Sequence, residues 1–259
     1  AATVMAIPDT LGPALERALT ALLPEETQHR LMRFTHPARR LQSLFGRLLA
    51  QRLANLASHA GQSPYHLREQ PPEGPQLTDF SGVSVGRFAV AHTDGCVAVS
   101  LSRRAMGIDL EQPTRAQQTK RLVSLAEFAF GARFARTIAA ASAVNLTRAQ
   151  EAFLAAWGIF ESAQKMNGDD REPANDSPLT DEVLKKYARA REVELFWEDV
   201  LLTRAPDGSA VAQRFVRTPA GLLTLLGGGP ADAPHALEWL DLTPEALLVE
   251  LTAHRHAYV

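Results

Sequence analysis

The sequence predicts an α+β fold, because helical patterns and strand patterns come in separate blocks along the chain. Residues 37–58 repeat apolar side chains at steps of three and four, which is typical of an amphipathic helix. Residues 83–111 change to alternating or β-branched runs, which are typical of strands. The same order, helices first and strands later, recurs in the second half, so the order suggests two α+β halves, 1–115 and 116–259. No residue-level repeat between the halves is visible.

The first half is expected to contain one long helix, a hairpin and a further strand. Pro37 suits the first helical position, and the arginines of the helix are expected on its polar surface: Arg39, Arg40, Arg47 and Arg52. Residues 69–77 form a turn-rich loop. The runs "RFAVAH" and "CVAVSLS" predict two strands joined by a turn at "HTDG", and "MGIDLE" (106–111) predicts the next strand.

The second half opens with two predicted helices, 120–142 and 147–168. Thr147 and Gln150 form a capping box at the start of the second helix, and Asn167–Gly168 provides its stop signal. A polar loop at 169–178 follows. Four strand-like segments complete the half: "EVELFWEDVLL", "AQRFVRT", "GLLTLLGG" and "ALEWLDL".

Composition excludes several classes of protein. The 259 residues are 46% hydrophobic, enough for a sizeable core, and the net charge of −2 is unlike that of a strongly basic nucleic-acid binder. No apolar run reaches the roughly 18–20 residues of a membrane helix, and the N-terminus lacks the pattern of a signal peptide. The single cysteine, Cys96, rules out an intramolecular disulfide and a zinc site of several thiolates. We therefore expect a protein of the reducing cytoplasm that does not bind membranes or nucleic acid.

Asp109 and Glu111 lie two positions apart in "MGIDLE", so a strand would place both carboxylates on one face. At about 6 Å and an effective dielectric of about 20, their repulsion is of order 2–3 kcal/mol. A divalent cation would offset that repulsion, and Mg²⁺ is usually held by one or two carboxylates together with substrate phosphates. The alternative is a solvated strand edge, where acidic residues are common.

Trp157, Glu161 and Lys165 are spaced by four and share one face of the predicted helix. An exposed Glu161–Lys165 pair would be worth only about 0.3–0.5 kcal/mol. Phe153 and Trp157 precede this pair on the same helix face, so the face changes from apolar to ionisable side chains along the helix. A carboxylate at the margin of a packed face has a raised pKa when it is desolvated and is then a candidate base.

His92 follows a strand-like run and precedes a turn, where a histidine is either structural or functional. The arginines of the first long helix are either a solvated face or a phosphate-binding group, since arginine suits bidentate contacts with phosphate.

Taken together, these segments resemble the 4′-phosphopantetheinyl transferases of the surfactin-synthetase type. "MGIDLE" keeps the G-I-D-x-E core of the acidic strand in that family, and "WGIFESAQK" keeps the tryptophan, glutamate and lysine of its W-x-x-K-E-x-x-x-K helix. "FAVAHT" (88–93) keeps the phenylalanine and histidine of its histidine motif. "GRLLAQR" (46–52) matches its basic helix, and "GPQL" (74–77) matches the loop before the histidine strand. The five matches follow the family order over residues 33–168.

The resemblance implies two similar α+β halves related by a pseudo-twofold, with the active site in the cleft between them. It implies holo-[acyl-carrier-protein] synthase activity: transfer of the phosphopantetheine arm of coenzyme A to a serine of an apo acyl or peptidyl carrier protein, with Mg²⁺, releasing 3′,5′-ADP. The family type is usually monomeric.

The resemblance also assigns roles to residues of this chain. Asp109, Glu111 and Glu161 match the metal-binding acids, and Glu161 also matches the residue proposed to activate the serine. Lys165 matches a lysine near the pyrophosphate. The remaining matches concern coenzyme A binding: His92, Arg40, Arg47, Gly74 and Pro75.

The chain departs from the family pattern at several of these positions. Phe160 replaces the lysine before the helix glutamate, which removes one positive charge beside the pyrophosphate. Ala89, Ala91 and Thr93 replace the asparagine and the serines of the histidine motif. An alternative is therefore a catalytically impaired relative that binds coenzyme A or a carrier protein. A third hypothesis is an unrelated α+β protein with solvent-facing acids.

Overall fold

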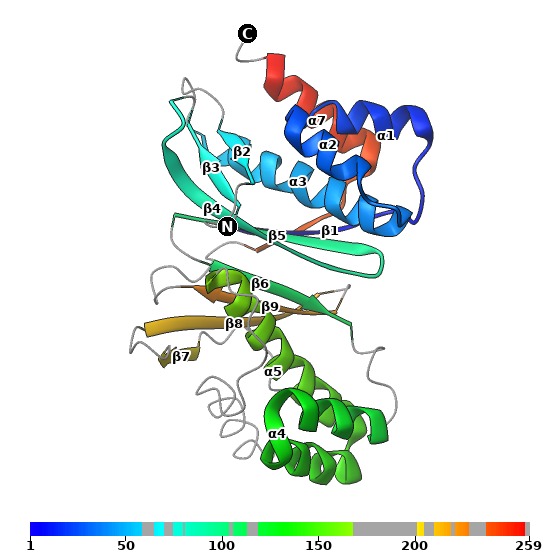
Figure 1. Cartoon of the computed structure of the whole chain (residues 1–259), viewed down its shortest axis with the longest axis vertical. Helices are drawn as coiled ribbons and strands as arrows, with labels where there is room; N and C mark the ends of the chain where they lie inside the picture. The colour runs from blue at the N-terminus through cyan, green and yellow to red at the C-terminus, as the bar shows by residue number, and fades with distance from the viewer. Residues whose placement is uncertain are drawn as a thin grey trace. The chain divides into compact units, whose positions relative to one another are not determined.

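The computed structural model describes residues 1–58, 65–69, 75–79, 81–103, 106–112, 119–167, 201–204, 210–218, 221–227 and 237–256. These residues form both helices and largely antiparallel strands, so the α+β class is confirmed (Figure 1). Internal contacts divide the chain into two units. Unit 1 comprises Ala1–Arg104 and Pro234–Val259, and unit 2 comprises Ala105–Ala233.

The two units differ from the expected halves 1–115 and 116–259 in two places. The acidic strand 106–111 belongs to unit 2, because it pairs with residues 222–227 and with no strand of unit 1 among those described. The last strand and helix belong to unit 1.

Unit 1 is a six-stranded sheet in the order β10-β1-β5-β4-β3-β2, with helices on one face (Figure 1). Its strands are β1 (Ala2–Ala6), β2 (His66–Arg68), β3 (Gln76–Thr78), β4 (Ser84–Thr93), β5 (Cys96–Ser102) and β10 (Leu237–Leu240). Its helices are α1 (Pro13–Thr20), α2 (Glu25–Met32), α3 (Pro37–Ala57) and α7 (Pro244–His256). All neighbouring strands are antiparallel except β1 and β10, which are parallel.

The core of unit 1 lies between α3 and the sheet. The apolar stripe predicted for residues 37–58 is buried there, and Val97 and Val99 of β5 face it. The predicted hairpin is confirmed: Thr93 pairs with Cys96, and a two-residue turn at Asp94–Gly95 joins β4 to β5. Gly95 has a φ of 72°, a conformation that glycine adopts without strain.

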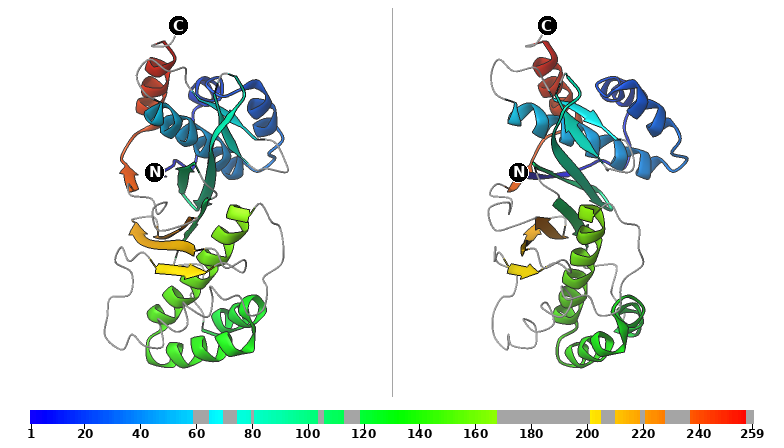
Figure 2. Two further views of the ribbon diagram at one scale, coloured as in Figure 1. Left: turned by 90° about the vertical axis from the view of Figure 1, so that its left-hand side faces the viewer. Right: turned by 60° about the vertical axis from the view of Figure 1, so that its left-hand side comes forward.

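Unit 2 is a four-stranded antiparallel sheet, β6-β9-β8-β7, with one long helix packed against it and a second helix packed against the first. Its strands are β6 (Met106–Glu111), β7 (Leu201–Arg204), β8 (Ala210–Thr218) and β9 (Gly221–Gly227). Its helices are α4 (Thr119–Val144) and α5 (Leu146–Asn167). In both views of Figure 2, α5 lies alongside the sheet, where it packs against β6 and β9.

Two local details of these helices correct the sequence-based expectations. The helix expected at 120–142 is interrupted at Gly131, where φ is 79° and ψ is 172°, so α4 consists of two helical pieces across a kink. The helix expected at 147–168 begins one residue earlier, and its cap is Asn145 rather than Thr147. The backbone N–H of Arg148 donates to Asn145 Oδ1 at 3.1 Å.

An aromatic cluster fixes α5 against α4. Trp157 stacks on Phe153 with ring centroids 6.1 Å apart, and Phe130 of α4 meets both rings edge to face. Phe160 joins the cluster against Trp157 and Phe130. These pairs hold the helix that carries Glu161 and Lys165 in one orientation within unit 2. No helix in the described part of the chain has the length and apolarity needed to cross a membrane.

Candidate functional site

Asp109, Glu161 and Lys165 meet where α5 crosses β6. The ammonium of Lys165 lies 3.0 Å from Asp109 Oδ1 and 3.8 Å from Glu161 Oε2. The aspartate comes from the strand, and the other two side chains come from one face of the helix, as their spacing of four predicts. Unit 2 therefore brings together three of the four ionisable residues predicted for this site.

Asp109 is not the solvated edge residue of the alternative hypothesis. Only 5% of its surface is exposed, and Ile108 and Leu110, its neighbours on the strand, are also buried. A carboxylate in such a position needs compensating charge or hydrogen bonds. Lys165, whose side chain is 31% exposed, supplies one such partner.

Burial raises the pKa of Glu161 above its ordinary value of 4.5. Desolvation is the largest cause; the nearby Lys165 opposes it, and the negative charge of Asp109 adds to it. A carboxylate with a raised pKa is a stronger base than an ordinary surface glutamate. The direction of this shift is the one expected for a glutamate at the margin of the packed helix face.

Two glycines allow α5 to approach the sheet closely at this site. A Cβ added to Gly107 would overlap the carbonyl oxygen of Ser162 and lie 2.5 Å from its carbonyl carbon. A Cβ on Gly158 would lie 3.0 Å from Thr224 Cβ and 3.5 Å from Asp109 Oδ2. Sequence reasoning missed both glycines as positioning residues, although the glycine of "MGIDLE" lies only two residues before Asp109.

The fit of this site to a metal ion can be judged from its donors. The carboxylates of Asp109 and Glu161 are hard oxygen donors of the kind Mg²⁺ prefers. The ammonium of Lys165 lies beside both of them, which shows that their combined negative charge already binds a cation at this place. Glu111 lies on the same strand face as Asp109. Among the residues that the structure describes, no group of three or more His, Cys, Asp and Glu side chains is arranged to hold a metal. The residues thus fit a metal held by two carboxylates, and the third ligand, Glu111, stays a prediction.

The basic residues predicted for nucleotide binding lie in unit 1 and have different surroundings. His92 is exposed at the end of β4, and Arg39 Nη1 of α3 donates to its Nε2 at 3.2 Å. Arg40 instead forms an ion pair with Glu16, with 2.7 Å between Nε and Oε1. Arg39 and His92 are therefore the pair that presents exposed nitrogen donors together.

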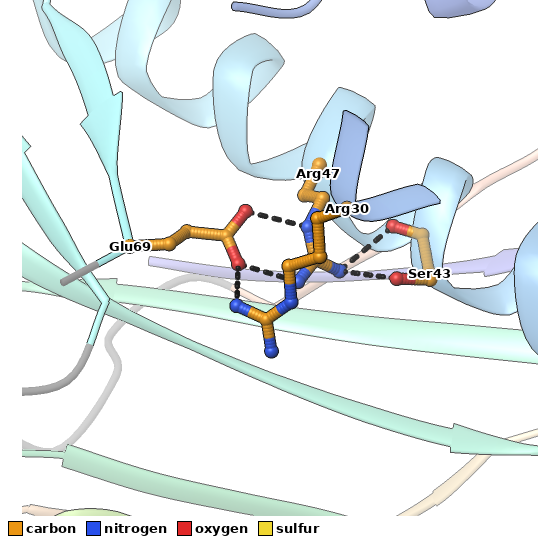
Figure 3. Close-up of polar contacts among 4 residues, drawn as sticks. All are labelled: Arg30, Ser43, Arg47 and Glu69. Carbon is orange, nitrogen blue, oxygen red and sulfur yellow. Dashed lines mark hydrogen bonds and ion pairs between the residues drawn. The ribbon is translucent and has the colours of Figure 1, made fainter. Parts of the chain in front are cut away.

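Arg47 is buried, contrary to the prediction that the arginines of α3 lie on its surface. Two nitrogens of its guanidinium donate to the carboxylate of Glu69, and the third donates to Ser43 (Figure 3). Arg30 of α2 donates to the same carboxylate. These partners use its donors within unit 1, an arrangement that favours a structural role over phosphate binding.

Arg52 also departs from the prediction of a surface arginine. It is buried and bound by Glu238 of β10 and Glu250 of α7, at 2.8 and 2.9 Å. Pro75 is exposed directly before β3, where its carbonyl accepts from the N–H of Phe88 at 3.3 Å. Gly74 lies outside the described residues, as does most of the segment "EVELFWEDVLL".

Comparison with known proteins adds no family assignment. No family model matches the chain, and no curated protein matches its sequence.

Proposed function

We propose that the chain is a magnesium-dependent 4′-phosphopantetheinyl transferase of the surfactin-synthetase type. The observation that carries the proposal is the meeting of Asp109, Glu161 and Lys165 at the crossing of β6 and α5. These are the residues that the two most specific motifs supply, "MGIDLE" and "WGIFESAQK". In an unrelated protein, nothing would require the carboxylates of these separate segments to share one ammonium.

The proposed reaction transfers phosphopantetheine from coenzyme A to a carrier serine. The serine oxygen forms a bond to the phosphorus on the pantetheine side of the pyrophosphate, and the bond from that phosphorus to the bridging oxygen breaks. 3′,5′-ADP leaves with the bridging oxygen. The serine proton passes to the carboxylate of Glu161, directly or through one water, and the raised pKa of this group suits the role.

Asp109 and Glu161 would hold Mg²⁺, with Glu111 as a further ligand. The metal would supply positive charge that neutralises the pyrophosphate oxygens. Lys165 would contact the pyrophosphate near its leaving side. We assign the 3′-phosphate of coenzyme A to Arg39 and His92, because they are adjacent and exposed, whereas Arg47 is committed to Glu69.

The remaining parts of the proposal follow from the same resemblance. They are a pseudo-twofold between the α+β parts with the active site in the cleft between them, an apo acyl or peptidyl carrier protein as partner, a monomeric state and a cytoplasmic location.

The decisive experiment incubates the protein with coenzyme A, Mg²⁺ and a panel of apo carrier proteins. Mass spectrometry should show a gain of one phosphopantetheinyl group on at least one carrier. Asp109→Asn and Glu161→Gln should each abolish the gain, and Glu127→Gln, which neutralises an exposed acid of α4, should retain it. Absence of modification on every carrier, at saturating coenzyme A, would refute the proposal.

A second candidate function is a non-catalytic coenzyme A or carrier-protein binding module. Phe160 favours it, because this residue stands where the family has a lysine and packs into the aromatic cluster with Trp157 and Phe130. Calorimetry that detects coenzyme A binding, without modification of any carrier, would support the module. Mg²⁺-dependent transfer would exclude it.

A further inference from the structure

We propose that Lys165 is the resident counter-ion of the Asp109–Glu161 pair and that Mg²⁺ displaces its ammonium from that pair. The inference rests on the proposed function, because the transferase assignment is what calls for Mg²⁺ at these carboxylates. It goes further by making the lysine and the metal alternative occupants of one site.

The geometry places the ammonium where it competes with a metal. Lys165 Nζ lies 3.0 Å from Asp109 Oδ1 and 3.8 Å from Glu161 Oε2, so it shares charge with both candidate ligands. A Mg²⁺ ion binds carboxylate oxygens at about 2.0–2.1 Å with strict octahedral geometry. Two cations this close to the same oxygens repel each other, and each therefore weakens the binding of the other.

Differences in burial determine which group moves. Asp109 is 5% exposed and held on a strand, whereas the Lys165 side chain is 31% exposed and sits in the last turns of α5. Its four-carbon stem is flexible and its ammonium is well solvated in water. The exchange thus moves the lysine outward while both carboxylates stay, and the released ammonium becomes available to a bound pyrophosphate.

Only one oxygen of the Asp109 carboxylate is open to this exchange. Oδ2 is buried under α5, where a Cβ on Gly158 would lie 3.5 Å from it. The incoming ion would therefore reach Asp109 through Oδ1, the oxygen that Lys165 contacts.

The first test measures Mg²⁺ binding by calorimetry, without coenzyme A or a carrier protein. Lys165→Gln removes the competing charge and should tighten Mg²⁺ binding by about tenfold, within the usual range of coupling between interacting sites. Lys120→Gln, at an exposed lysine of α4, is the matched control and should bind as the unaltered protein does. Equal or weaker binding by Lys165→Gln, or no binding by either protein, would overturn the proposal.

The second test needs no variant and so does not depend on how Lys165→Gln folds. The chain has four lysines, Lys120, Lys165, Lys185 and Lys186, so reductive methylation followed by peptide mass spectrometry resolves each of them. Saturating Mg²⁺ should raise the methylation rate of Lys165 severalfold relative to Lys120. An unchanged ratio would show that the ammonium stays on its carboxylates and would overturn the exchange.

The outcomes separate this proposal from the transferase assignment. Carrier modification without Mg²⁺-dependent release of Lys165 would refute the exchange alone. Release of Lys165 by Mg²⁺ without modification of any carrier would uphold the exchange and refute the proposed function.

Discussion

Replacing Gly107 with alanine is expected to force β6 and α5 apart without changing any charged group. Gly107 lies on the same strand face as Asp109, and the backbone of Ser162 covers it. The new methyl carbon would overlap the Ser162 carbonyl oxygen and lie 2.5 Å from the carbonyl carbon and 2.9 Å from Cα. Because all three atoms belong to the helix backbone, no side-chain rotation relieves the clash.

The distances set the size of the effect. Ordinary carbon contacts begin near 3.4 Å, so the strand and helix must separate by about 1 Å or more. Overpacking of a buried site costs about 1–3 kcal/mol, and a clash between backbone segments belongs at the upper end of that range. We expect the free energy of unfolding to fall by about 3 kcal/mol. The same displacement draws Lys165 and Glu161 away from Asp109, so carrier modification should fall as well.

Urea unfolding followed by circular dichroism measures the loss, with the slope of the transition checked for each variant. Gly12→Ala is the matched control, because a Cβ there meets no atom within 4 Å and its φ is −61°. Its stability should stay within about 1 kcal/mol of the unaltered protein. If Gly107→Ala were as stable as Gly12→Ala, the close packing of β6 on α5 would be refuted.

Three further predictions concern single side chains. Arg39→Gln should raise the KM for coenzyme A severalfold and leave kcat nearly unchanged in steady-state kinetics, whereas Arg30→Gln should alter neither constant; equal effects would remove Arg39 from the phosphate site. Arg47→Met leaves the buried carboxylate of Glu69 without its bidentate partner, so the free energy of unfolding measured in urea should fall by about 3–5 kcal/mol. Arg30→Met removes a largely exposed side chain and should lower it by at most about 1 kcal/mol. Similar losses for the two variants would contradict a structural role for Arg47. The pKa of Glu161 is raised in the folded state, so the folded protein binds more protons than the unfolded chain just above pH 4.5. The contribution of Glu161 to the stability of the fold therefore falls as the pH rises through the folded pKa. The stability of the unaltered protein relative to Glu161→Gln should therefore decrease from pH 4.5 towards neutrality, and a difference independent of pH would contradict the raised pKa.

Elements with strong local patterns were predictable from sequence. The stripe of α3, the hairpin β4–β5 with its Asp94–Gly95 turn, strand β6 and helix α5 all lie close to their expected positions. In each case the apolar spacing within the segment agrees with the burial that the fold requires. The helical spacing of Glu161 and Lys165 likewise placed both side chains on the correct face.

Long-range partners were not predictable in the same way. Strand β1 pairs with β10 from the far end of the sequence, and neither short strand carries a pattern that names its partner. The burial of Arg47 and Arg52 depends on Glu69, Glu238 and Glu250, which lie outside their helix. The spacing within a helix predicts that an arginine lies on its polar face. Whether that arginine is buried depends on acidic side chains that other parts of the fold place beside it.

The position of β10 and α7 has a consequence for the order in which the chain folds on the ribosome. Unit 2 is interposed between the two segments of unit 1, so it is synthesised in full before the final strand of the larger sheet emerges. Until then the edge of β1 that pairs with β10 has no partner strand, and the guanidinium of Arg52 lacks the carboxylates of Glu238 and Glu250. The nascent six-stranded sheet is thus completed only after unit 2 has been translated, so the unit that carries Asp109 and Glu161 has time to fold first.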